Sequence, residues 1–79
     1  MYKCVGIRPS SFNGNDGQTV NGKNLYFVYP LESGEGHGTE RVFMTVDKLS
    51  TCTVVPKVND VVDIIYNRYG KVSDFRTSG

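Results

Sequence analysis

The strongest constraint on the fold of this 79-residue chain is an alternation of apolar and polar side chains with a period of two. It is clearest in residues 23–31, where the apolar series is Leu25, Phe27, Tyr29 and Leu31. Successive side chains of a β-strand point to opposite faces, so this segment is predicted to be a strand with one apolar face. No long segment has the period of a helix. The sequence therefore predicts an essentially all-β protein.

Four more strands follow from the same pattern. Residues 2–8, 39–46, 61–66 and 71–75 alternate in the same way. Pro9 is expected to end the first strand, because proline cannot donate a ladder hydrogen bond. Residues 67–70 form the clearest hairpin turn, in which Gly70 can take a positive φ. Residues 47–50 are predicted to form a single helical turn capped by Thr45 or Asp47, and Pro56 prevents a longer helix.

The remaining segments are connections. Residues 10–22 are polar and glycine-rich, which predicts either a long flexible loop or a flexible hairpin excursion, here called the wing. Phe12 is its one large ring and is expected to pack on the core. Residues 32–38 are expected to form a flexible hairpin tip, and residues 77–79 a frayed end.

Length and strand count together predict the architecture. Residues 1–79 form one domain with a thin core, and dimerisation would cover leftover apolar surface. Five short strands fit a small five-stranded barrel of the OB or SH3-like type, with at most one short helical turn. The OB type is favoured because the connection between the third and fourth strands is longer, and that fold usually places a helix there. A sandwich would normally need more strands.

Enzymatic chemistry finds little support in the sequence. The single histidine, His37, lies between glycines at a hairpin tip. The chain has no carboxylate pair at a defined spacing, no nucleophile motif, no phosphate loop and no metal-ligand spacing. Cys4 and Cys52 are expected to be buried, reduced thiols. The sequence thus predicts no catalysis, no cofactor and no metal.

Charge and hydropathy restrict the partners. The N-terminal segment lacks the apolar run of a signal peptide, and no segment reaches membrane-spanning length. A cytoplasmic protein without membrane contact is therefore expected. The net charge of +1 excludes a global field that attracts nucleic acid or anionic lipid, so any such binding must come from a local patch.

The positive signal is a set of aromatic rings interleaved with cations. A tyrosine ring can stack on a base while its hydroxyl stays hydrated, and lysine or arginine can neutralise the flanking phosphates. The hairpin tip with Arg68 and Tyr69 is the least typical of a core. The residues predicted to contact nucleic acid are Lys23, Tyr26, Arg41, Tyr66, Arg68, Tyr69 and Lys71.

Structural roles compete with this hypothesis. Phe27, Tyr29 and Phe43 are expected to fill the barrel, and Tyr66 could instead pack across its hairpin on Val72. The cations could form an ordinary solvated face, because carboxylates are interspersed with them along the chain.

Three motifs resemble those of a known family. They are Ile7-Arg8-Pro9-Ser10, the series from Gln18 to Lys23, and a late hairpin with Tyr66, Tyr69-Gly70 and Val72. In these motifs the chain resembles the small OB-fold single-stranded-DNA-binding proteins of filamentous bacteriophage. Similar short proteins occur on other phages and mobile elements.

The resemblance implies a homodimer of OB barrels, in the cytoplasm of a bacterial host, that coats single-stranded DNA during DNA replication without sequence preference. It also implies that residues 10–23 form a DNA-binding wing, that Tyr69 lies on a hairpin at the dimer axis, and that Tyr26 stacks on a base. The chain departs from the family at residues 9–22, which contain no lysine or arginine. This shifts the prediction to Lys23, Tyr26, Arg68, Tyr69 and Lys71.

Two other functions remain open. An SH3-like barrel could present Tyr26, Tyr66 and Tyr69 as a groove for an extended or proline-rich peptide. Alternatively, the aromatic residues could form an oligomer interface in a protein without a ligand. RNA could also replace DNA as the partner, because stacking hardly distinguishes the sugar.

Overall fold

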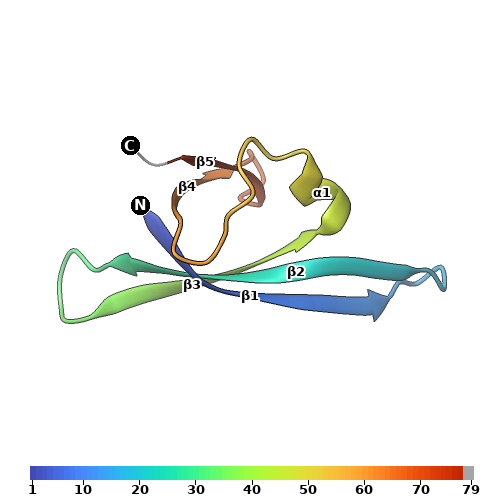
Figure 1. The fold of residues 1–79 in the computed structure, drawn as a ribbon, viewed down its shortest axis with the longest axis horizontal. Coiled ribbons are helices and arrows are strands. Elements are labelled where there is room, and N and C mark those ends of the chain that lie inside the picture. The colour runs from blue at the N-terminus through green and yellow to red at the C-terminus, as the bar shows by residue number, and fades with distance from the viewer. Residues whose placement is uncertain (78–79) are drawn as a thin grey trace.

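The computed structural model describes residues 1–77 as five strands and one short helix (Figure 1). In chain order they are β1 (Tyr2–Asn13), β2 (Thr19–Pro30), β3 (His37–Thr45), α1 (Val46–Ser50), β4 (Val61–Tyr66) and β5 (Val72–Thr77). Of the end predicted to fray, Thr77 still belongs to β5, whereas residues 78 and 79 lie outside the described residues.

The strands form one antiparallel sheet in the order β3-β2-β1-β4-β5. Strands β1, β2 and β3 make a long lower layer, and the β4–β5 hairpin and α1 lie over one side of it (Figure 1). The predicted all-β class with five strands and one short helical turn is confirmed. Closure into a barrel is not confirmed, because β3 and β5 are the two edges of the sheet and do not pair with each other.

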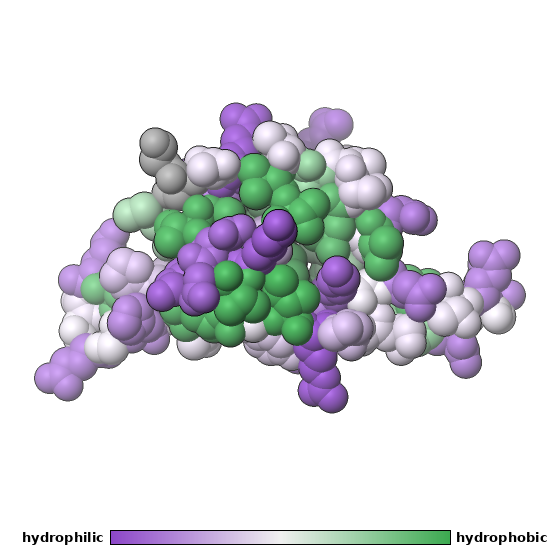
Figure 2. All heavy atoms as spheres, in the orientation of Figure 1, coloured by the Kyte–Doolittle hydropathy of each residue, from purple (hydrophilic) through white to green (hydrophobic). Residues whose placement is uncertain are grey.

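The core lies between these two layers. Its buried members are Cys4, Leu25, Phe27, Val42, Met44, Leu49, Val62, Ile64 and Phe75. The rings of Phe27 and Phe75 join the layers, with their centroids 5.8 Å apart. Hydrophobic residues gather over the middle of the molecule, and hydrophilic residues cover both ends of the long layer (Figure 2). The apolar face predicted for residues 23–31 is thus the face that β2 turns to the core.

The wing is a hairpin, the second of the two predicted alternatives. Its strands extend to Asn13 and from Thr19, and residues 14–18 make the turn between them. The prediction that Pro9 ends the first strand is wrong. Pro9 pairs with β2, while β4 pairs with β1 only at Tyr2 and Lys3. Beyond that point one side of β1 is an edge, where a missing N–H is tolerated.

A β-bulge in β1 changes which side chains reach the core. Cys4 and Gly6 pair with consecutive residues of β2, which leaves Val5 without a partner. As a result Cys4 and Ile7 both pack in the core, and Val5 is exposed. Strict alternation would place Cys4 and Ile7 on opposite faces of the strand, and the extra residue of the bulge brings them to the same face.

Two connections are built as predicted. Helix α1 begins after Thr45, whose Oγ1 accepts a hydrogen bond from Lys48 N–H at 3.2 Å. In the β4–β5 turn, Gly70 has a φ of 76°. Asn67 stabilises this turn through its side chain, because its Oδ1 accepts hydrogen bonds from the N–H groups of Tyr69 (2.8 Å) and Lys71 (3.1 Å).

The connection between α1 and β4 covers part of the β5 edge. Val54 N–H donates to the carbonyl of Phe75 at 3.2 Å. The Asp74 carboxylate accepts hydrogen bonds from the Thr53 hydroxyl and the Thr53 N–H, each at 2.7 Å. These hydrogen bonds hold the pKa of Asp74 below its ordinary value. Thr53 and Val54 are therefore fastened to β5 by these contacts.

The two cysteines are free thiols, as predicted. Cys4 is buried, whereas Cys52 is half-buried, so the expected full burial holds for one of them. Burial raises the pKa of both thiols. Within residues 1–77, no helix has both the length and the apolar character needed to cross a membrane.

Candidate functional site

The side of the β1–β2–β3 layer that points away from the core carries aromatic and cationic side chains together. We call it the outer face and define it by its rings and cations, which are Lys3, Arg8, Phe12, Tyr26, Arg41 and Phe43. Tyr26 lies between two buried residues of β2, so its ring points outward. In the strand register Arg41 lies directly opposite Tyr26, and Arg8 and Phe43 lie on either side of Asn24. The fold thus brings together two of the predicted contact residues, Tyr26 and Arg41.

Two phenylalanines that were expected in the core lie on this face instead. Phe43 alternates with the buried Val42 and Met44, so its ring points outward and is 38% exposed. Phe12 is 52% exposed, because the far end of the β1–β2 hairpin extends beyond the second layer. The centroids of the Phe12 and Phe43 rings are 5.7 Å apart. The prediction that these two rings pack inside is therefore wrong.

A glycine makes room for Phe43. Gly22 belongs to an Asn-Gly pair that favoured a turn, but it lies inside β2, opposite Thr45. A Cβ atom at this position would lie 2.5 Å from Phe43 Cζ and 2.6 Å from the Met44 carbonyl oxygen. Both separations are far shorter than van der Waals contact. The missing side chain lets the Phe43 ring lie against the sheet while its other side faces solvent.

The charges on the outer face have one sign. Lys3, Arg8 and Arg41 point outward, and Glu40, the single carboxylate residue in β1, β2 and β3, points to the opposite side. Among residues 1–77, the ion pair found is the one between the N-terminal ammonium group and Asp63, at 3.8 Å. The cations of this face therefore have no carboxylate partner in the described part of the chain.

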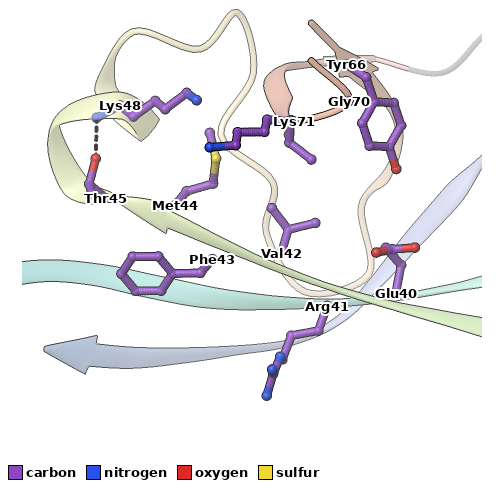
Figure 3. Close-up of a pocket in the computed structure, with 11 residues that line it drawn as sticks. Glu40, Arg41, Val42, Phe43, Met44, Thr45, Lys48, Tyr66, Gly70 and Lys71 are labelled. Carbon is purple, nitrogen blue, oxygen red and sulfur yellow. Dashed lines mark hydrogen bonds between the residues drawn. The ribbon is translucent and has the colours of Figure 1, made fainter. Parts of the chain in front are cut away.

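A second surface lies where the sheet is open. A groove of about 450 Å³ runs between β3 and the β4–β5 hairpin, with Val42 in its apolar floor. Lys48 from α1 and Lys71 from the β4–β5 turn line one end, and their side chains extend toward each other (Figure 3). Glu40 and Tyr66 line the other end (Figure 3). The same view shows Arg41 extending away from the groove, on the side of the outer face.

Tyr66 belongs to a group of tyrosines on the core side of the sheet. We call Tyr2, Tyr29 and Tyr66 the tyrosine cluster. The rings of Tyr2 and Tyr29 are 5.3 Å apart between centroids. Burial, and after it the neighbouring Tyr2 hydroxyl and the Glu40 carboxylate, raise the pKa of Tyr66. In the strand register Tyr66 lies opposite Val72, the residue on which the structural alternative would pack it. Its neighbours Tyr2 and Glu40 are on the core side, so Tyr66 lies on the side of the sheet opposite to Tyr26.

The tip of the β4–β5 hairpin is exposed, as its sequence indicated. Tyr69 is 74% exposed, and the Arg68 guanidinium carbon lies 5.4 Å from the centroid of the Tyr69 ring. This spacing is that of a cation–π contact. The tip is a small ring-and-cation pair of its own, separate from the outer face.

The structure does not bring all seven predicted contact residues together. Tyr26 and Arg41 share the outer face, Tyr66 and Lys71 line the groove, and Arg68 and Tyr69 form the hairpin tip. Lys23 stands apart, in a shallow hollow beside Pro9 and Val46. Lys23 is on the same side of β2 as the core-facing residues Leu25 and Phe27, but it lies beyond the end of the core and is exposed.

The seven predicted contact residues leave out several members of these surfaces: Lys3, Arg8, Phe12, Phe43 and Lys48. A signal for Phe43 was available, because it alternates with Val42 and Met44, which were assigned to the apolar side. No local signal could have paired Lys48 with Lys71, because they come from separate elements that meet only in the folded chain.

The remaining chemistry is sparse. Residues 1–77 contain no group of three or more side chains placed to hold a metal ion. His37 is exposed at the start of β3. No protein-family model, no curated protein and no solved structure matches this chain. The surface itself is the basis for a functional inference.

Proposed function

We propose that this protein binds single-stranded nucleic acid, with DNA as the expected ligand, through the outer face and without catalysis or sequence preference. The observation that carries the proposal is the row of outward rings and cations on strands whose single carboxylate faces the other way. Tyr26 and Phe43 would stack on bases, and Arg8 and Arg41 would neutralise the adjacent phosphates. In OB-type sheets, this same face of the second and third strands and its flanking loops bind oligonucleotides.

The charge of the face determines the expected character of binding. Each phosphate contact to a single strand contributes about −0.7 to the slope of log affinity against log salt. The three outward cations, Lys3, Arg8 and Arg41, would therefore give a slope of roughly −2. Stacking adds about 1–3 kcal/mol per base and is tolerant of sequence. Binding should be moderate in strength and sensitive to salt.

Fluorescence anisotropy with a labelled oligo-dT at rising salt tests this proposal. Affinity should fall steeply with salt, and Arg41→Gln should weaken binding. Arg76→Gln removes the same charge from β5, away from the outer face, and should leave affinity nearly unchanged. Absence of binding at low salt, or equal effects of the two variants, would contradict the proposal. An oligo-U titration in parallel distinguishes DNA from RNA.

We further propose a homodimer that acts in the cytoplasm of a bacterial host during phage or mobile-element replication, as the resemblance to the filamentous-phage proteins implies. Exposed apolar side chains support an association surface: Met1, Val5, Val58 and Val61 are each at least 41% exposed. The molar mass from size-exclusion chromatography with light scattering tests the dimer. A monomer at all concentrations would contradict it.

A peptide-binding module is the second candidate. The specific observation in its favour is the free edge of β3, to which an extended peptide could add a strand. The groove once expected from Tyr26, Tyr66 and Tyr69 does not support it, because Tyr26 and Tyr66 lie on opposite sides of the sheet. Peptide binding of this kind would depend little on salt, which separates it from the first proposal.

A further inference from the structure

Two lysines in the groove between β3 and the β4–β5 hairpin have no role in the outer face. Lys48 and Lys71 both line the groove, and their side chains extend toward each other (Figure 3). Glu40 is the acidic residue among the groove-lining residues, and it lies at the opposite end beside Tyr66. Neither lysine forms an ion pair with a carboxylate of residues 1–77. This end of the groove is therefore cationic and unneutralised.

The backbone positions from which both lysines extend are fixed by hydrogen bonds. Lys48 lies in α1, where its N–H donates to the capping hydroxyl of Thr45 at 3.2 Å. Lys71 closes the β4–β5 turn, where its N–H donates to Asn67 Oδ1 at 3.1 Å. Two ammonium groups that converge repel each other, and an anion between them converts that repulsion into attraction. A phosphodiester group has the charge that this position lacks.

The groove is also continuous with the outer face. Strand β3 is the wall between them, because Val42 faces the groove while Arg41 and Phe43 face outward (Figure 3). No strand pairs with the far side of β3 within residues 1–77. A flexible single strand that leaves the outer face can therefore cross this free edge and enter the groove.

We propose that the groove is a phosphate subsite, in which Lys48 and Lys71 bind phosphodiester groups of the same strand whose bases stack on the outer face. The inference rests on the proposed function and deepens it, because it defines the path of the ligand over the β3 edge. It also assigns a length requirement. A strand too short to cross the edge contacts the outer face alone.

The test compares two double variants that remove the same charge. Lys48→Gln with Lys71→Gln changes the groove, and Lys57→Gln with Arg76→Gln changes exposed positions outside it. Anisotropy is measured at several salt concentrations with oligo-dT of about 4 and about 16 nucleotides, the range covered by one OB-type domain. Circular dichroism checks that all variants fold, which is expected because the four side chains are exposed.

With the longer oligonucleotide, the salt slope of the groove variant should be shallower than that of the unmodified protein by about 1.4, two phosphate contacts at about 0.7 each. With the shorter one, the slopes of both should agree. The control variant should keep the original slope in both cases. An unchanged slope of the groove variant with the longer strand would overturn the subsite. An equal loss in the control would overturn it as well.

Two further arms separate this inference from the proposal beneath it. If the unmodified protein binds neither oligonucleotide, the proposed function fails. If it binds both and only the length-dependent difference is missing, the subsite alone fails. In a backbone-amide NMR titration, the signals of residues 48 and 71 should shift with the longer oligo-dT. Saturable shifts of the same size with inorganic phosphate alone would instead identify a free-anion site and overturn the assigned path.

Discussion

The two faces of the β1–β2–β3 layer carry similar numbers of aromatic rings but use them differently. On the core side, Phe27 packs on Phe75, and Tyr2 and Tyr29 contact each other within the tyrosine cluster. On the outer face, the ring of Phe43 packs on Gly22 and lies beside Phe12, yet both rings stay more than a third exposed. A ring on one face is therefore used for stability, and a ring on the other is free to bind.

The two faces also differ in charge, because residues next to each other in the chain point to opposite sides of a strand. Glu40 and Arg41 are neighbours in the chain, yet Glu40 lies beside the tyrosine cluster and Arg41 beside Tyr26. A chain with a net charge of +1 thus carries no carboxylate on the outward side of β1, β2 and β3. The proposed phosphate binding depends on this segregation of charge across a strand, since the net charge alone gives no attraction.

The largest expected effect would come from removing a ring on the core side. Phe27→Ala should lower the free energy of unfolding by about 3–5 kcal/mol, because Phe27 is 1% exposed and its loss leaves a cavity. Urea denaturation measures it. Phe27→Leu should lower the free energy of unfolding by a smaller amount, and this variant can be measured if the alanine variant does not fold. A cost below about 1 kcal/mol for the alanine variant would show that this face does not form the core.

Gly22→Ala should lower both the stability of the fold and the binding of oligo-dT. The added Cβ meets the Phe43 ring and the Met44 carbonyl, so the strands must shift and the ring must move away from residue 22. We expect a loss of about 1–3 kcal/mol in unfolding free energy, together with weaker binding of oligo-dT. Gly17→Ala is the control for the loss of a glycine without a clash: the added Cβ meets no atom, so the positive φ of 80° should cost stability while binding stays unchanged. Normal oligo-dT binding by Gly22→Ala would contradict a role for the Phe43 ring in its position against Gly22.

A smaller effect should appear in acid, at the contact between Asp74 of β5 and Thr53 in the connection after α1. The folded-state pKa of Asp74 lies below its ordinary value of 3.8, so the unfolded chain binds the proton more readily. The stabilisation from the Thr53–Asp74 contact is therefore present above that value and is lost as the pH falls through the lower, folded-state pKa. Thermal unfolding of Asp74→Asn and the unmodified protein between about pH 5 and about pH 2 measures it. The two melting temperatures should converge at the acidic end, and a constant difference would contradict this assignment.

The smallest effect is expected at Tyr66, the predicted contact residue that lies on the core side. Tyr66→Phe should change the unfolding free energy at neutral pH by no more than about 0.5 kcal/mol, and it should leave oligo-dT binding unchanged. Because the pKa of Tyr66 is raised above 10.0 in the folded state, stability should fall as the pH rises past that value. The variant should reduce this alkaline loss. Weaker oligo-dT binding by Tyr66→Phe would contradict this prediction and indicate that Tyr66 contacts the oligonucleotide.

Much of the fold could be predicted because its signals are local. The alternation in β2 and β3, the Thr45 cap and the positive φ of Gly70 each depend on a few neighbouring residues. The errors arose where a distant contact decided the outcome. Pro9 stays in its strand because β4 is absent on that side, and the bulge at Val5 depends on the pairing with β2.

The candidate site was less accessible to sequence reasoning for the same cause. Aromatic and cationic residues were recognised as a set, but the set divides among the outer face, the groove and the hairpin tip. Tyr26 and Arg41 lie opposite each other only because of the β2–β3 register. Lys48 and Lys71 line the same groove only because the hairpin and α1 lie over the same side of the layer.

By itself, then, the sequence determined that the chain is built of strands, where most of them turn, and which residue types are available for binding. Periodicity and turn chemistry act over a few residues, and they can be read without a partner strand. The tertiary structure alone decided which rings are covered, which face lacks carboxylates, and that the sheet stays open between β3 and β5. These properties depend on register and on layer packing, in which a shift of one residue exchanges the two faces of a strand.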